Sequence, residues 1–154
     1  MSDLRKYREK RDFDKTPEPK GGKTKSAFPL FVIQKHDASH LHYDFRLEIG
    51  GTLVSWAVPK GMPKTFSNRR LAVNTENHPL AYADFEGTIP EGEYGAGEVE
   101  IYDRGTYINL SEKTMKKCLK EGKITIELKG KKMKGNYALI HMKEKNWLLI
   151  KMKK

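Results

Sequence analysis

The stretch LHYDFRLEI, residues 41–49, decides the fold and also carries the first functional side chains. Its odd positions are apolar and its even positions are polar, which is the pattern of a β-strand with one buried face. Gly50 and Gly51 follow, and residues 52–58 have the composition of a second strand. The two stretches therefore predict a β-hairpin with a glycine turn.

Outside this hairpin the sequence predicts more short strands and little helix. Residues 70–76 alternate again, with Leu71, Val73 and Thr75 on one face. Further strands are predicted at 98–102, 106–110, 123–128, 136–142 and 146–152. Many short antiparallel strands indicate a mainly β fold, either a closed or nearly closed barrel or a sandwich.

Two short helices are expected beside the strands. Residues 111–121 read as a helix with Ser111 as its N-cap and Gly122 as its stop, and residues 4–11 as a shorter one. The prolines and glycines that follow residue 15 favour irregular structure. We expect residues 1–27 to form a basic strap over the site and residues 28–154 to form the single folded domain.

Charge is divided unevenly along the 154 residues, whose net charge is +10. Residues 1–27 carry nine basic and five acidic groups, residues 28–112 seven and twelve, and residues 113–154 fourteen and three. An acidic middle between basic ends suits a cation site in a protein that also contacts a polyanion. Solubility alone could also explain the lysines.

Several classes of protein are disfavoured by composition. No apolar run reaches the roughly 18 residues of a membrane helix, and the charged N-terminus does not resemble a secretory signal. The single cysteine, Cys118, cannot form an internal disulfide. We expect a cytoplasmic monomer without a membrane partner.

The polar face of residues 41–49 is the main functional signal. Side chains two apart on a strand project from the same face, so His42, Asp44 and Arg46 share one surface. His36 lies beyond a short turn and can supply a third ligand. Two histidines and a carboxylate suit a divalent transition metal with open positions, and Arg46 would then hold a phosphate oxygen.

A second polar set follows the same logic on the next strand. Arg70, Asn74, Glu76 and His78 share the even phase, provided that the strand remains extended as far as His78. Pro79 favours that extension. A histidine beside a bound phosphate can donate a proton or stabilise developing charge.

Three weaker signals are read as structural. Gly92, Gly95 and Gly97 favour a surface loop over a phosphate loop, because no helix follows them. Cys118 reads as a buried thiol. Trp56 and Trp147 read as core residues.

The sequence from Gln34 to Glu48, QKHDASHLHYDFRLE, resembles the N-terminal 3′-phosphoesterase domain of bacterial DNA ligase D. The resemblance continues through segments near 55–61, 70–73, 76–80, 85–95 and 103–105, and it reaches both ends of the chain. No ligase or polymerase module accompanies it, so the sequence looks like a stand-alone form. One departure is His40, where relatives more often have arginine.

The resemblance implies a β-barrel of about eight strands that binds Mn2+, with Co2+ or Zn2+ also possible, through His36, His42 and Asp44. It implies roles at the phosphate or the pocket wall for seven residues: Gln34, Arg46, Lys60, Arg70, Glu76, His78 and Tyr82. It also matches Arg11, Asp12 and Glu18 to positions that close over the substrate.

The activity implied is removal of a 3′-terminal ribonucleotide from DNA or RNA primer ends, followed by removal of the remaining 3′-phosphate. A separate DNA ligase or other end-joining proteins would be its partners. Two alternatives stay open from the residues alone. One is a non-haem iron oxygenase in which His42, Asp44 and His78 form the triad. The other is a non-catalytic nucleic-acid-binding module.

Overall fold

The structure, a computed structural model, describes residues 4–21 and 28–153. Its strands are β1 (Leu30–Asp37), β2 (Leu41–Ile49), β3 (Thr52–Val58), β4 (Arg69–His78), β5 (Gly87–Ile89), β6 (Gly97–Asn109), β7 (Lys123–Lys129), β8 (Lys134–Lys143) and β9 (Asn146–Lys151). Its helices are α1 (Arg5–Glu9), the 3-10 turn η1 (Leu80–Asp84) and α2 (Met115–Glu121).

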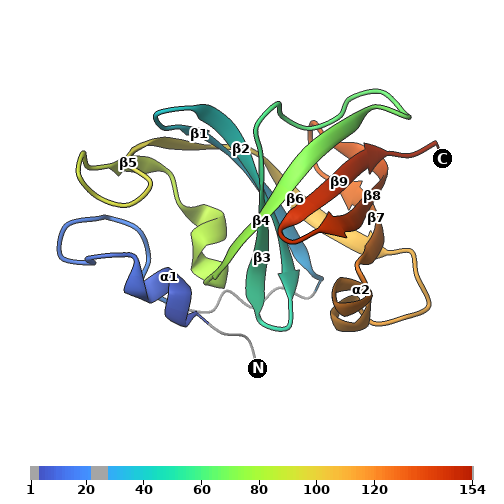
Figure 1. The fold of residues 1–154 in the computed structure, drawn as a ribbon, viewed down its shortest axis with the longest axis horizontal. Coiled ribbons are helices and arrows are strands. Elements are labelled where there is room, and N and C mark those ends of the chain that lie inside the picture. Colours follow the sequence, from blue (N-terminus) through green and yellow to red (C-terminus); the bar gives the residue numbers. More distant parts are fainter. Residues whose placement is uncertain (1–3, 22–27, 154) are drawn as a thin grey trace.

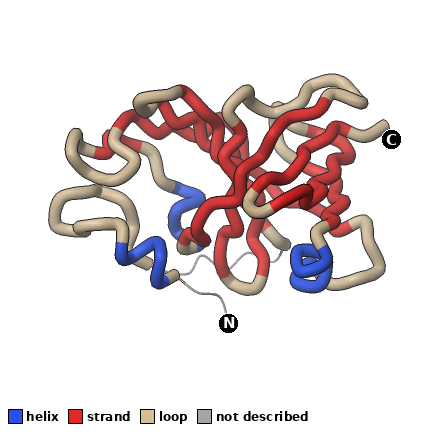
Figure 2. The backbone as a smooth tube through the Cα atoms, viewed as in Figure 1, coloured by secondary structure: helices blue, strands red, loops and turns tan. Residues whose placement is uncertain are grey.

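The strands form a closed barrel, as Figures 1 and 2 show. Eight of them follow the order β1-β2-β3-β4-β9-β8-β7-β6, and pairing of β1 with β6 closes the ring. The short strand β5 pairs with β6 outside the ring. The mainly β class and the eight-stranded antiparallel barrel are therefore confirmed, and the sandwich is excluded.

Two apolar clusters lie on opposite sides of the barrel wall. The first fills the interior and includes Phe45, Trp56 and Trp147, so both tryptophans are core residues as predicted. The second lies outside, where Tyr7 of α1 and Tyr82 of η1 pack on Val32 of β1. A barrel needs no outer core, so this second cluster serves to fasten the N-terminal segment and η1 over one patch of the wall.

The helix at residues 111–121 begins later than the sequence predicts. Thr114, not Ser111, is the N-cap, and its side chain accepts a hydrogen bond from the Lys117 N–H. Ser111 instead accepts from the Lys113 N–H in the preceding turn. Gly122 ends the helix at φ 83° as predicted, and Cys118 is buried in the barrel core.

The two strands predicted at 98–102 and 106–110 are one strand, β6. The intervening Asp103 is buried and continues the strand instead of turning it. Its carboxylate accepts the backbone N–H groups of Lys131, Lys132 and Met133, which lie in the β7–β8 connection. Aspartate often marks a turn, but here Asp103 holds the β7–β8 connection against β6.

A register shift in β4 changes which of its side chains share a face. Ser55 pairs with Thr75, but Leu53, two residues away on β3, pairs with His78, three residues further along β4. The extra residue moves the later side chains to the other face. His78 therefore does not share a face with Arg70, although β4 stays extended as far as His78.

Within the described residues, no helix is long and apolar enough to cross a membrane.

Candidate metal and phosphate site

A cavity of about 330 Å³ lies on the outer face of the barrel wall, between the strands β1–β4 and the segments that cover them. His36 of β1 and three side chains of β2, those of His42, Asp44 and Arg46, line it, because the odd-numbered side chains between them face the barrel interior. The cover consists of the N-terminal segment, η1 and the loop between β5 and β6, which lie together on one side of the barrel in Figure 1.

Three of the lining side chains form a potential metal site. His42 Nε2 lies 3.2 Å from one Asp44 carboxylate oxygen, and His36 Nδ1 lies 3.5 Å from the other. The three ligand atoms all lie within 4.8 Å of one another. The residues predicted to bind metal are thus brought together.

Hydrogen bonds to the backbone leave one nitrogen of each ring available. His36 Nε2 donates to the Gly95 carbonyl at 2.7 Å, and His42 Nδ1 donates to the His40 carbonyl at 3.2 Å. A carbonyl can only accept, so the nitrogens that face Asp44 carry lone pairs when the rings are neutral. This is how metal-binding histidines are usually oriented, and the N, N, O donor set fits a divalent transition metal.

The electrostatics of the cluster favour an ionised carboxylate. Burial alone would raise the pKa of Asp44, but the Arg46 guanidinium, together with the hydrogen bonds that His36 and His42 donate when their rings are protonated, holds it well below its usual range. The hydrogen bond to Asp44 raises the pKa of His42, and burial opposes that rise. A cation in this cluster would therefore meet a carboxylate that is already charged.

Arg46 is held rigidly beside the cluster. Its Nε donates to the Gln34 Oε1 at 2.7 Å, and its Nη2 lies 3.5 Å from Asp44. Gln34 is fully buried, and its Nε2 donates to the carbonyls of Tyr82 and Phe85. Gln34 thus orients Arg46 and fastens η1, without lining the cavity itself.

His78 lies in the cavity on the far side of Arg46. Its Nδ1 donates to the Glu76 carbonyl at 2.9 Å, and its Nε2 faces Arg11 Nη2 at 3.5 Å. Burial, and after it the charges of Arg46 and Arg11, lower its pKa well below the ordinary value, so the ring is neutral. His78 is outside the metal-ligand cluster, and the triad of the oxygenase alternative is not formed.

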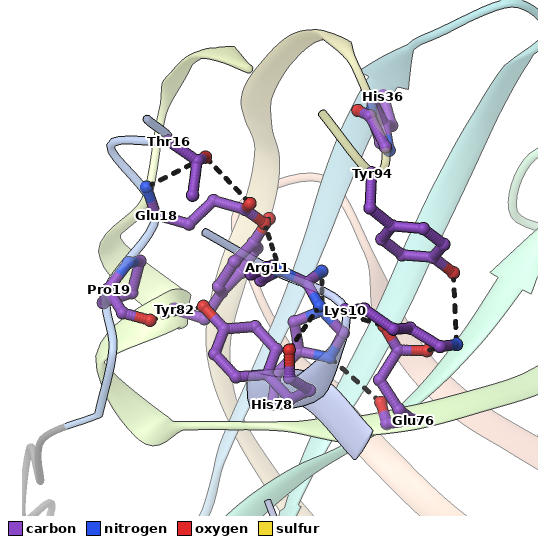
Figure 3. A network of polar contacts seen from close by, with 12 residues as sticks. Lys10, Arg11, Thr16, Glu18, Pro19, His36, Glu76, His78, Tyr82 and Tyr94 are labelled. Carbon is purple, nitrogen blue, oxygen red and sulfur yellow. Dashed lines mark hydrogen bonds and ion pairs between the residues drawn. The ribbon is translucent and has the colours of Figure 1, made fainter. Parts of the chain in front are cut away.

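The N-terminal segment supplies a second guanidinium to the cavity (Figure 3). Arg11 Nε lies 3.0 Å from Glu18, its Nη1 lies 3.3 Å from Glu76, and its guanidinium stacks on the Tyr7 ring at 4.1 Å. Glu18 also accepts from the Tyr82 hydroxyl at 2.6 Å. The segment is therefore tied to both sides of the cavity by residues that face it.

Three predicted residues lie away from this cavity. Lys60 and Arg70 line a separate cavity at one end of the barrel, together with Lys64 and Tyr102. The β4 register shift explains this, because Arg70 lies before the extra residue and His78 after it. Asp12 is exposed and accepts from the Asp14 N–H, so it organises a turn in the N-terminal segment.

Sequence reasoning missed three contributors. Tyr7 is fully buried against His78, with ring centroids 4.9 Å apart. Tyr94 lines the cavity, and its hydroxyl accepts from Lys10 at 3.4 Å. Gly95 lies in the loop predicted to be only surface, yet its carbonyl orients His36. A backbone carbonyl can accept a hydrogen bond whatever the side chain, so the sequence does not reveal this contact. Only the spacing of the glycines could have drawn attention to this loop.

Comparison with known proteins gives one consistent result. Residues 34–141 match the family described as the DNA Ligase D 3'-phosphoesterase domain. The multifunctional non-homologous end joining protein LigD of Pseudomonas aeruginosa is 48% identical over 157 residues, covering 97% of this chain and 18% of that protein. LigD proteins of Mycolicibacterium smegmatis (48% over 160 residues) and Mycobacterium tuberculosis (47% over 156 residues) each match 97% of this chain and 20% of their own length. The chain thus spans about a fifth of the relatives that it matches.

Proposed function

The chain belongs to the DNA ligase D 3′-phosphoesterase domain family, and from that premise we propose that it is a metal-dependent hydrolase that repairs 3′ ends of nucleic acid for end joining. Its substrates would be DNA or RNA 3′ ends in a primer–template duplex. It would first remove a 3′-terminal ribonucleotide as a phosphodiesterase and then remove the remaining 3′-phosphate as a phosphomonoesterase, leaving a 3′-OH.

One observation carries the proposal: a His-His-Asp cluster and two guanidinium groups line the same cavity, with a neutral histidine between the guanidinium groups. The cluster suits a divalent cation, and the guanidinium groups of Arg11 and Arg46 suit phosphate oxygens. A non-catalytic binding module would need the arginines but would have no use for the buried cluster.

Mn2+ is the metal that we propose, held by His36, His42 and Asp44, and Co2+ or Zn2+ would suit the same donors. When bound, the metal supplies Lewis-acid polarisation of a phosphoryl oxygen. The protein's own groups then have separable tasks. Arg46, fixed by Gln34, holds a non-bridging oxygen, and Arg11 neutralises charge that develops on the phosphate.

His78 would exchange a proton at the phosphate through its Nε2. With the ring proton on Nδ1 and engaged by the Glu76 carbonyl, Nε2 carries the lone pair, so it would first take up a proton and could then pass that proton to the leaving oxygen. Tyr82, whose hydroxyl donates to Glu18, closes the other side of the cavity. Arg11 would have to rotate from His78 toward the phosphate when substrate enters.

Residues 1–27 would act as a strap over the site, and residues 28–154 as the catalytic domain. The strap residues 1–3 and 22–27 lie outside the described part of the chain. Lys60 and Arg70 line a separate cavity, so they would contact a neighbouring phosphate of the substrate and not the scissile one. A DNA ligase would complete the repair.

The test is a 5′-labelled primer–template with one 3′-terminal ribonucleotide, incubated with Mn2+ or with EDTA. We expect shortening to a 3′-phosphate and then conversion to a 3′-OH, with Mn2+ only. The His40→Ala variant is the matched control, since the His40 side chain is exposed and should leave both steps intact. An unchanged primer under every divalent metal would overturn the proposal, and activity that needs iron, oxygen and a keto acid would replace it with the oxygenase.

A further inference from the structure

We propose a second binding site: a groove at the end of the barrel that takes a single-stranded segment of nucleic acid. We call it the lysine groove, and its lining includes Phe66, Lys129, Lys134, Lys151, Met152 and Lys153. The cavity there measures about 640 Å³, larger than the cavity with the metal cluster. Its use in end repair rests on the proposed function, whereas binding itself can be tested separately.

The aromatic ring of the groove is fixed in an exposed position. Phe66 is 59% exposed and lies in the connection between β3 and β4, shortly before β4 begins. Two backbone hydrogen bonds tie the residues after Phe66 to the end of β9, from the Ser67 N–H to the Lys151 carbonyl and from the Lys151 N–H to the Asn68 carbonyl.

The turn also contains an unfavourable backbone conformation. Ser67 has φ 70°, a value that a residue with a side chain adopts only at a cost. Burying a phenylalanine ring is worth about 1.5–3 kcal/mol, yet this turn holds the ring out in solvent. A ring held exposed on a rigid turn is suited to receive a flat partner.

The lysines of the groove repel one another instead of being paired. Lys129 and Lys134 lie directly opposite each other on β7 and β8, an arrangement that is destabilising for like charges. Among the described residues, none of the four lysines of the groove forms an ion pair with a carboxylate, and Glu127 is the one acidic residue in the lining. An anion in the groove would relieve this repulsion.

Two of these lysines, Lys151 and Lys153, make side-chain contacts within the groove. Lys151 Nζ donates to the Lys134 carbonyl and lies 4.7 Å from the Tyr137 ring, and Lys153 Nζ lies 5.8 Å from the Phe66 ring. The next turn of the β7–β8 connection is fixed by the buried Asp103 carboxylate. One positive charge, that of Lys153, therefore lies beside the aromatic ring, and the other three lysines line the same groove before any ligand arrives.

Charge and shape together select the occupant. A positive groove with an exposed aromatic ring is how proteins bind single strands without sequence preference, because phosphates meet the lysines and a base stacks on the ring. Bases within a duplex are not free to stack in this way. An acidic peptide would satisfy the lysines but would leave the ring unused.

The groove lies apart from the metal cluster yet can be reached by the same strand. In Figure 1 the connections β3–β4 and β7–β8 both lie at the top of the barrel, while α1 and β5 lie to one side. The β3–β4 connection contributes Lys60 and Lys64 to one cavity and Phe66 to the lysine groove. A strand that leaves the metal cavity could follow this connection from phosphate to phosphate.

The experiment measures binding without catalysis. A fluorescein-labelled single strand that ends in a 3′-OH is titrated in EDTA, and its anisotropy is followed at several salt concentrations. Phe66→Ala should weaken binding by roughly 5- to 150-fold, the value of one base–aromatic stack, and Phe66→Trp should preserve it. Lys129→Gln with Lys134→Gln should lower the salt slope by about 1.4, since each neutralised phosphate of a single strand contributes about 0.7.

Matched controls separate this site from general attraction. Lys117→Gln with Lys120→Gln removes the same charge from exposed positions on α2, and Met142→Ala removes an exposed apolar side chain elsewhere. These controls should bind like the parent. Equal losses in the α2 variant, or parental binding by Phe66→Ala, would overturn the groove.

A second readout separates the groove from the proposed function. Hydrolysis of bis(p-nitrophenyl) phosphate with Mn2+ uses a substrate too small to span both sites, so the groove variants should match the parent. If the parent hydrolyses nothing while Phe66→Ala loses strand binding, the proposed function fails and the groove stands. If hydrolysis is normal and Phe66→Ala binds normally, the groove fails and the function stands.

Discussion

At the scale of single residues, the site depends on side chains whose partners leave only one atom available for chemistry. His36 and His42 each give one nitrogen to a backbone carbonyl, and His78 does the same through Nδ1. What distinguishes His78 is its neighbours: within the described part of the chain, two guanidinium groups and no carboxylate lie within hydrogen-bond distance of its ring nitrogens. These different neighbours are the reason why we propose a metal-ligand role for His36 and His42 and a proton-transfer role for His78.

The role of His78 can be separated from metal binding by one substitution. His78→Ala should keep Mn2+ affinity and lower turnover by roughly 10²- to 10⁴-fold, the usual contribution of a general acid or base. The measurement is single-turnover hydrolysis of both the diester and the monoester at saturating Mn2+. Parental rates for both steps would remove His78 from the chemistry, and weakened Mn2+ binding would return it to the metal ligands.

Gln34 offers a test of how η1 and Arg46 are held in position, because its side-chain amide acts both as a donor and as an acceptor. Its amide donates to two carbonyls while its oxygen accepts from Arg46. Gln34→Glu keeps the shape but places a carboxylate against those carbonyls; the Tyr82 carbonyl keeps the Phe85 N–H as a donor, so we expect a cost of about 1–3 kcal/mol from the Phe85 carbonyl that loses its side-chain donor. Urea unfolding measures this loss, and an unchanged midpoint would show that η1 is fastened by other contacts.

At the scale of elements, the register shift in β4 divides a predicted functional face between two cavities. Period-two reasoning placed Arg70 with Glu76 and His78, because a sequence pattern does not reveal an extra residue in a strand. Pairing with β3 shows the shift between Thr75 and His78, and Arg70 consequently lines the cavity that contains Lys60. The Nε atom of Arg70 is buried there and has no hydrogen-bond partner among residues 4–21 and 28–153.

This division predicts different kinetics for the two cavities. Lys60→Ala and Arg70→Ala should each raise KM for a primer–template by roughly 10- to 100-fold, the value of one charged hydrogen bond to phosphate. Turnover of bis(p-nitrophenyl) phosphate should not change, because that substrate cannot occupy both cavities. A loss of its turnover would show that these side chains reach the scissile phosphate after all.

The N-cap of α2 can be tested with two matched variants of Thr114, one that removes the capping hydroxyl and one that keeps it. Thr114→Ala should destabilise the protein by about 1 kcal/mol, since it removes the acceptor for the Lys117 N–H, whereas Thr114→Ser keeps that acceptor. Thermal unfolding of the two variants provides the measurement. If Ser111→Ala proved more costly than Thr114→Ala, the helix would begin where the sequence pattern first placed it.

At the scale of the whole molecule, the sequence predicted the barrel, the grouping of His36, His42 and Asp44, and an N-terminal strap, but not the apolar contacts that fasten that strap to the barrel wall. The alternation in residues 41–49 was sufficient to place His42 and Asp44 on one face, since period two needs no tertiary information. The second apolar cluster could not be read in this way, because Tyr7 and Val32 belong to segments without a shared pattern. Backbone contributions such as the Gly95 carbonyl are equally invisible in a sequence.

The central claim is that His36, His42 and Asp44 hold one divalent metal beside a phosphate pocket. Mn2+ titration followed by electron paramagnetic resonance tests it most directly, on the parent and on His36→Ala, His42→Ala, Asp44→Ala and His78→Ala. We predict one ion per parent chain, parental affinity in His78→Ala, and losses in the other three beyond the roughly 10- to 100-fold that an outer partner of a metal ligand contributes. Parental Mn2+ binding by Asp44→Ala would contradict the account.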